Sequence, residues 1–129
     1  MASEARLAQL VIGANDLAQS RRFYQEVMGL QHLYDGPQVS AFAIGGVRLL
    51  LTTRPGFRAP EQQGVIPYLA CIGIDKRHAE MLAAGATDGG KPHRIAELRD
   101  IEVWIAFVKD PSGNAVGLIE ERRRQRPMR

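Results

Sequence analysis

The sequence predicts a single α+β domain built from two copies of one unit, in which a strand and a helix are followed by three strands (βαβββ). Two apolar runs, residues 7–14 and 67–74, each precede an aspartate that can begin a helix, Asp16 or Asp75. Each half then closes with two apolar runs joined by a glycine-containing turn. At 129 residues, one domain with a proper core is the default expectation.

In the first half, the apolar run 7–14 predicts a strand. Asn15 or Asp16 can cap a helix over residues 17–28, and Gly29 is placed to end it.

Strands are expected at 39–44 and 47–53, joined by Gly45-Gly46, a pair typical of hairpin turns. Residues 55–65 carry prolines and glycines and predict a linker between the two halves.

In the second half, the run 67–74 predicts a strand, and Asp75 is expected to cap a helix over 77–84 that ends at Gly85. The segment 89–92, Gly-Gly-Lys-Pro, is expected to break the chain before a strand near residues 93–98.

A hairpin over residues 105–120 closes the domain. Its turn is Asp110-Pro111-Ser112-Gly113-Asn114, in which proline presets one backbone angle and glycine accepts a positive φ.

Composition points to a protein of reducing compartments. Cys71 is the only cysteine, so no internal disulfide can form. No run approaches the ~20 apolar residues of a membrane span, and the N-terminus lacks the apolar core of a signal peptide. We therefore expect a cytoplasmic protein without a membrane partner.

The net charge of +3 comes from the C-terminus. Residues 122–129 hold five arginines, and without them the chain has 12 basic and 14 acidic residues, a net of −2. We interpret this segment as a disordered, solubilising tail. Nucleic acid is not expected as a partner, because no nucleic-acid motif or interleaved aromatic residue accompanies the arginines.

These features resemble the vicinal oxygen chelate superfamily, which includes glyoxalase I, extradiol dioxygenases and bleomycin-resistance proteins. The resemblance covers residues 7–121 and rests on segments 9–17 and 68–72, on Phe23-Tyr24 and on the 110–114 turn. It implies two modules, about 7–54 and 66–121, whose curled mixed sheets form a glyoxalase-like cup around a cavity. It also implies a homodimer.

The family's metal ligands fall, by this resemblance, on Gln9, Tyr68 and Gly117, with Leu50 as the counterpart of Gly117 in the first module. A divalent ion needs about three protein oxygens or nitrogens. Gln9 offers one neutral oxygen, Tyr68 is protonated near neutral pH, and Gly117 and Leu50 offer nothing. We therefore expect no metal and no other cofactor.

Other metal or nucleophile candidates are weaker. His32, His78 and His93 lack metal-site spacing and are interpreted as surface or capping residues. Cys71 is interpreted as a small buried residue. Glu120 is three residues from Gly117, so it should lie on the opposite face of its strand.

Side-chain alternation along strands selects the residues that face the cavity if Gln9 does. The expected wall is apolar with a few polar groups, as in small-molecule pockets. An arginine inside an apolar strand, Arg48, needs an anionic partner or solvent at an open rim, and both alternatives stay open. The candidate ligand-binding residues are Gln9, Val11, Arg48, Leu50, Tyr68, Ile105, Phe107 and Gly117.

Three functions are compatible with the sequence. The first is a metal-free protein that binds a small apolar or anionic molecule. The second is a metal-dependent lyase, epimerase or dioxygenase, or a metal-free enzyme with Tyr68 as acid or base. The third is an interaction domain that makes contact through the arginine tail.

Overall fold

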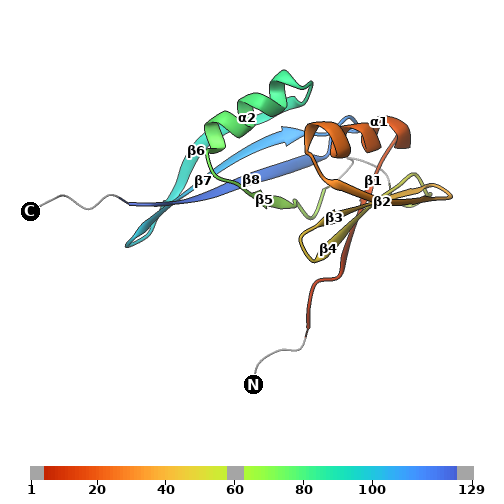
Figure 1. Cartoon of the computed structure of the whole chain (residues 1–129), viewed down its shortest axis with the longest axis horizontal. Helices are drawn as coiled ribbons and strands as arrows, with labels where there is room; N and C mark the ends of the chain where they lie inside the picture. The colour runs from red at the N-terminus through yellow and green to blue at the C-terminus, as the bar shows by residue number, and fades with distance from the viewer. Residues whose placement is uncertain (1–4, 58–62, 125–129) are drawn as a thin grey trace, which may run out of the picture. The chain divides into compact units, whose positions relative to one another are not determined.

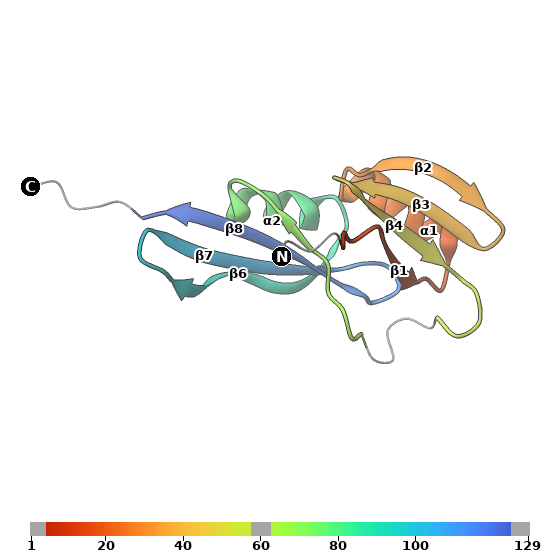
Figure 2. The same cartoon turned by 90° about the horizontal axis from the view of Figure 1, so that it is seen from below.

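A computed structural model describes residues 5–57 and 63–124 of the chain. The chain divides into two compact units, with the boundary after residue 62 (Figures 1 and 2). We call them unit 1 (residues 1–62) and unit 2 (residues 63–129). Each contains a four-stranded mixed sheet with a helix on one face. This is the repeat that the sequence predicts.

Unit 1 has the strand order β1-β4-β3-β2, with β1 parallel to β4 and the other pairs antiparallel. Its core lies between helix and sheet, where Tyr24, Phe42, Leu49 and Leu51 are fully buried. The elements are β1 (Gln9–Gly13), α1 (Leu17–Arg22), the π-helical turn η1 (Phe23–Val27), β2 (Gln31–Gly36), β3 (Val39–Ile44) and β4 (Val47–Thr52).

The predicted ends of the first helix are confirmed. Asp16 is its N-cap, and the Oδ1 atom of Asp16 accepts a hydrogen bond of 3.0 Å from the Gln19 backbone N–H. Gly29 takes the positive φ of 72° expected just past a helix. The wider π geometry over η1 was not predicted.

Unit 2 repeats the topology as β5-β8-β7-β6, with β5 parallel to β8. Ile74 and Met81 from the helix pack with Val108, Val116 and Leu118 of the sheet in a fully buried core. The elements are β5 (Tyr68–Ala70), α2 (Ile74–Ala83), β6 (Thr87–Glu97), β7 (Ile101–Lys109) and β8 (Ala115–Arg123).

The predicted closing hairpin is confirmed as β7 and β8. The Oδ1 atom of buried Asp110 accepts hydrogen bonds from the backbone N–H groups of Ser112 (2.9 Å) and Asn114 (2.8 Å). The Asn114 side chain donates to Asp110 Oδ2 at 2.9 Å, and Gly113 takes a φ of 89°. One carboxylate therefore satisfies most donors of the turn.

Two strand predictions need correction. The segment 89–92 does not break the chain, because β6 passes through it with irregular register opposite β7. The glycines fit there because Phe107 lies close: a Cβ on Gly89 would be 3.1 Å from Phe107 Cβ. The predicted strand 67–74 is also too long, since β5 ends at Ala70.

The predicted cap of the second helix is wrong. Gly73, with a φ of 76°, is the N-cap of α2, and Asp75 lies inside the first turn. The carboxylate of Glu120, reaching from β8, accepts hydrogen bonds from the backbone N–H groups of Gly73 (2.7 Å) and Ile74 (3.1 Å). The side chain of Glu120 thus lies on the helix side of the sheet, away from the face of Gly117, as alternation predicts.

The first residues of the predicted disordered arginine tail are ordered, because Arg122 and Arg123 belong to β8. Arg122 belongs to β8, bonds to Glu120 (2.9 Å) and Asp75 (3.0 Å), and lies 4.5 Å from the centre of the Trp104 ring. Arg124 pairs with Glu97 at 2.6 Å. Residues 125–129 lie outside the described residues. Across residues 5–57 and 63–124, no helix is long and apolar enough to cross a membrane.

Candidate functional site

The helix-free face of each sheet carries the predicted site residues. In unit 1, Leu49 and Leu51 point to the helix and are buried, whereas Arg48, which precedes Leu49 on β4, and Val11 on β1 are exposed. Gln9 and Leu50 share this face by register and are half-buried. The first module thus presents a small open surface with one amide and one guanidinium.

Gln9 and Arg48 contact each other directly. The two residues pair across the parallel strands β1 and β4, and Arg48 Nε donates a hydrogen bond of 2.7 Å to Gln9 Oε1. The guanidinium carbon also lies 6.0 Å from the centre of the Tyr34 ring on β2. Tyr34 reaches this face because a bulge follows His32, and no pattern in the sequence indicates that bulge.

In unit 2, Tyr68 and Gly117 are the corresponding pair of residues, which lie opposite each other on the parallel strands β5 and β8. The Tyr68 ring lies across Gly117 so closely that a Cβ at residue 117 would be 2.6 Å from Tyr68 Cδ2. The ring also makes an edge contact with Phe107, with centroids 5.6 Å apart. Aromatic surface therefore occupies the space above Gly117.

The strand registers revise one correspondence between the modules. Gln9 pairs with Arg48 as Tyr68 pairs with Gly117, so Arg48 is the structural counterpart of Gly117. The predicted counterpart, Leu50, pairs with Val11 two residues further along. Arg48 follows the last glycine of its turn, Gly46, by two residues, whereas Gly117 follows Gly113 by four. Equal spacing from the two turns therefore selected Leu50 instead of Arg48.

The side chains at these positions do not fit the donor set of a divalent ion, considered unit by unit. Unit 1 offers one amide oxygen already bonded to a guanidinium, which is itself a cation. Unit 2 offers a phenol whose ring covers a glycine. Among the described ranges, no group of three or more His, Cys, Asp or Glu side chains lies close enough to hold a metal.

Two further candidates from the sequence lie on the helix-free face of unit 2. Phe107 is half-buried and Ile105 is buried, with 8% of its surface exposed. Both lie directly opposite residues of β8 in the antiparallel pair, Phe107 opposite Gly117 and Ile105 opposite Ile119. These residues make the second face mostly apolar.

The structure defines the surroundings of two further candidates, His78, which is buried, and Cys71, which is half-buried. His78, interpreted from the sequence as a surface or capping residue, is buried, and its Nε2 lies 3.2 Å from Asp88 Oδ1 and 3.1 Å from the Phe107 carbonyl oxygen. Burial, with the nearby Glu120 charge, raises the pKa of the Cys71 thiol. A raised pKa keeps the thiol protonated and makes it a poor nucleophile.

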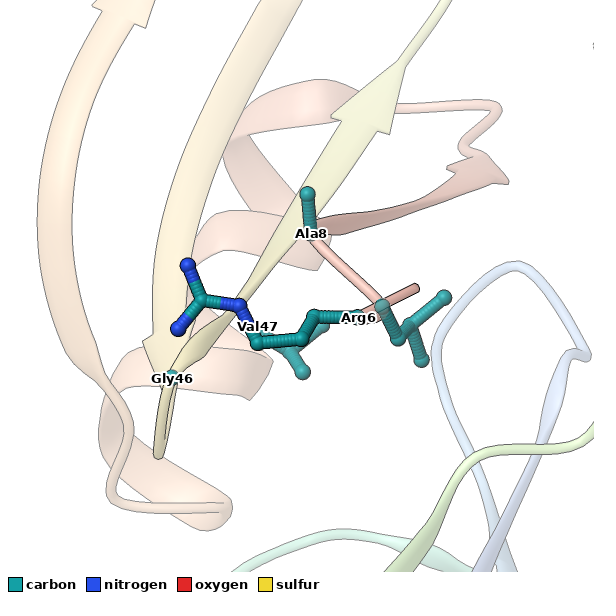
Figure 3. Close-up of a pocket in the computed structure, with 5 residues that line it drawn as sticks. Arg6, Ala8, Gly46 and Val47 are labelled. Atoms are coloured by element: carbon teal, nitrogen blue, oxygen red, sulfur yellow. The ribbon is translucent and has the colours of Figure 1, made fainter. Parts of the chain in front are cut away.

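A separate hollow of about 510 Å³ lies at the end of the first sheet in unit 1 (Figure 3). It is lined by Arg6, Leu7, Ala8, Gly46 and Val47. None of the predicted ligand-binding residues lines it.

Comparisons with known proteins agree on the fold. The family model described as "Glyoxalase/Bleomycin resistance protein/Dioxygenase superfamily" matches residues 6–118. A probable lactoylglutathione lyase of Vibrio parahaemolyticus is 28% identical over 130 residues, covering 93% of this chain and 94% of that relative.

Solved structures are similar over most of their length. A superfamily member from Sphaerobacter thermophilus has a TM-score of 0.74 at 20% identity, covering 90% of this chain and 97% of the other. A lactoylglutathione lyase from Agrobacterium tumefaciens has a TM-score of 0.68 at 20% identity, covering 92% and 95%. At these identities the likeness concerns the fold alone.

Proposed function

Because the chain belongs to the Glyoxalase/Bleomycin resistance protein/Dioxygenase superfamily, we propose that it is a small-molecule-binding protein that works without a divalent metal. The observation that carries the proposal concerns Arg48 and Gly117, which occupy equivalent strand positions in the two units and offer no metal ligand. A guanidinium lies at Arg48, and the Tyr68 ring covers Gly117. Neither arrangement supports a cation site, since one adds positive charge and the other removes the space for a ligand side chain.

The helix-free sheet faces supply the binding surface in this proposal. They combine apolar side chains such as Val11, Leu50 and Phe107 with the polar groups of Gln9, Arg48 and Tyr68, a composition typical of small-molecule sites. The ligand is a small apolar or anionic molecule. The protein acts as a homodimer, as the resemblance to the superfamily implies, in the reducing cytoplasm that a single cysteine favours.

Elemental analysis of protein purified without chelator tests the proposal. We expect well under one equivalent of metal per chain, and no rise in unfolding temperature when Zn²⁺, Mn²⁺, Ni²⁺ or Fe²⁺ is added, because a metal that binds the native state alone must stabilise it. About one metal per chain, together with a thermal shift, would contradict it.

A second candidate is a lyase of the metal-dependent kind. The observation that favours it is the 28% identity to a probable lactoylglutathione lyase along nearly the whole chain. Turnover of lactoylglutathione that depends on added metal would support this candidate. Turnover without metal that Tyr68→Phe abolishes, while binding persists, would instead support acid–base catalysis by Tyr68.

A further inference from the structure

We propose that Arg48, oriented by Gln9 and flanked by Tyr34, binds the carboxylate of an aromatic or otherwise apolar small molecule. The inference rests on the proposed function, because it gives a chemical class to the ligand of the same sheet face. It assigns a specific task to the position that corresponds to Gly117 in the other unit. The guanidinium of Arg48 binds the carboxylate of the ligand.

The guanidinium is oriented but not neutralised. Its Nε–H donates to the neutral Gln9 Oε1 at 2.7 Å, which fixes the plane of the group. No carboxylate of the described residues contacts it, and its two terminal nitrogens carry no hydrogen bond to any described residue. By contrast, Arg21 of the same unit pairs with Asp35 at 2.9 Å.

A guanidinium held in this way suits a planar anion. Its two terminal N–H groups form a fork that matches the two oxygens of a carboxylate, and charge-assisted bonds of this kind are stronger than neutral ones. The side chain of Arg48 is exposed, so a ligand can reach the fork without moving the strand. Gln9 acts as a positioning residue, since it touches the arginine and leaves the fork open.

The neighbours of Arg48 favour an apolar body on the ligand. The Tyr34 ring lies 6.0 Å from the guanidinium carbon and is 44% exposed, which leaves ring surface for stacking. Ala43 is the β3 residue directly opposite Arg48, and Val11 and Leu50 lie two residues along the same face. A bare inorganic anion would leave this apolar surface in water.

NMR titration of the ¹⁵N-labelled full chain tests the proposal, with benzoate as the probe and benzamide as the neutral probe of equal shape. We expect saturable shifts of the Arg48 Nε–H and of the backbone amides around residues 9 and 48 with benzoate. Benzamide should bind about tenfold more weakly, because it lacks the charge that the fork recognises.

Variants distinguish recognition by the two terminal N–H groups of Arg48 from a general effect of positive charge. Arg48→Gln should weaken benzoate binding about tenfold, and Arg48→Lys, which keeps the charge but loses the fork, should weaken it about threefold. Arg22→Gln is the matched control. It removes one exposed arginine of the same unit, on α1, and should leave benzoate affinity unchanged.

Equal weakening by Arg48→Gln and Arg22→Gln would overturn the proposal, as would saturation by benzamide at the same concentration as benzoate or the absence of any saturable benzoate shift. The metal analysis is independent of these results. A metal-containing protein whose Arg48 still binds benzoate would refute the metal-free function and leave the carboxylate site standing.

Discussion

Gly117 lies directly under the Tyr68 ring, and the ring can lie there because residue 117 has no side chain. A Cβ at this position would be 2.6 Å from Tyr68 Cδ2, 2.8 Å from Cε2 and 3.0 Å from Cγ. The contact includes the base of the ring, so a small twist of its far edge cannot relieve it. Residue 117 and residue 68 are therefore coupled: a larger residue at one requires a change at the other.

We predict that Gly117→Ala lowers the free energy of unfolding by about 1–3 kcal/mol, the usual range for overpacking. The loss should shrink when Tyr68→Ala is added, because the double variant removes the clashing ring. Urea unfolding of both single variants and the double variant measures the coupling. Strictly additive effects would show that the ring moves aside freely.

Glu120 stabilises the N-terminus of α2 through its ionised carboxylate. Burial raises the pKa of this carboxyl, but hydrogen bonds from the backbone of Gly73 and Ile74 and from Arg122 outweigh burial and lower the pKa below its ordinary value. A group whose pKa is lowered by folding stabilises the protein above its unfolded-state pKa. That contribution is lost as the pH falls through the folded-state pKa.

We predict that Glu120→Gln lowers the free energy of unfolding by about 1–2 kcal/mol at neutral pH, the scale of a charge-assisted hydrogen bond. The difference from the native protein should narrow as the pH falls from about 4.3, the ordinary pKa of glutamate, through the lowered pKa of folded Glu120, below which both proteins carry a neutral group. Urea unfolding across that pH range measures it. Glu121→Gln on the exposed side of the same strand is the control, and an equal, pH-independent loss in both variants would contradict the prediction.

Among the elements, the hairpin turn between β7 and β8 has the most specific local chemistry. We predict that Asp110→Ala lowers the free energy of unfolding by about 2–4 kcal/mol, because it leaves buried N–H groups of residues 112 and 114 without an acceptor. Asp110→Asn keeps one acceptor oxygen and should cost about 1 kcal/mol. Chemical denaturation of the two variants tests the order, and equal losses would show that only the charge matters.

Elements with local chemical signals were predictable from the sequence, and elements set by their neighbours were not. The turn at 110–114 and the cap at Asp16 use side chains within a few residues of the groups they bind. Strand β2 carries five polar or exposed positions in six residues, so it has no alternation to detect, and it exists because β3 offers an edge. The N-terminus of α2 was missed because its acceptor, Glu120, lies 46 residues away.

The candidate site shows the same division. Alternation along strands placed Gln9 and Arg48 on one face of the first sheet, and in the second sheet it placed Glu120 on the face opposite Gly117, as the structure shows. The hydrogen bond between Gln9 and Arg48, the Tyr68 ring over Gly117 and the participation of Tyr34 depend on strand register and on a bulge. Register between strands 39 residues apart is a tertiary property, which the local pattern does not contain.

At the scale of the whole molecule, each unit covers only one face of its sheet with its own helix. The opposite faces carry apolar side chains with substantial exposure, such as Val11 at 40% and Tyr68 at 44%. Units of about 60 residues bury a smaller fraction of their surface on folding than larger domains do, so further burial adds to their stability. Association of two chains would bury the parts of these faces that the ligand leaves uncovered.

We therefore predict that the protein is a homodimer in solution, with a mass near 28 kDa, twice the 14.2 kDa of one chain. Sedimentation equilibrium or light scattering behind size exclusion measures the mass directly. If the dimer dissociates when it unfolds, the unfolding temperature must rise with protein concentration, by mass action. A single species of 14.2 kDa at every concentration, with an unfolding temperature that does not depend on concentration, would contradict the prediction and leave each chain to bind its ligand alone.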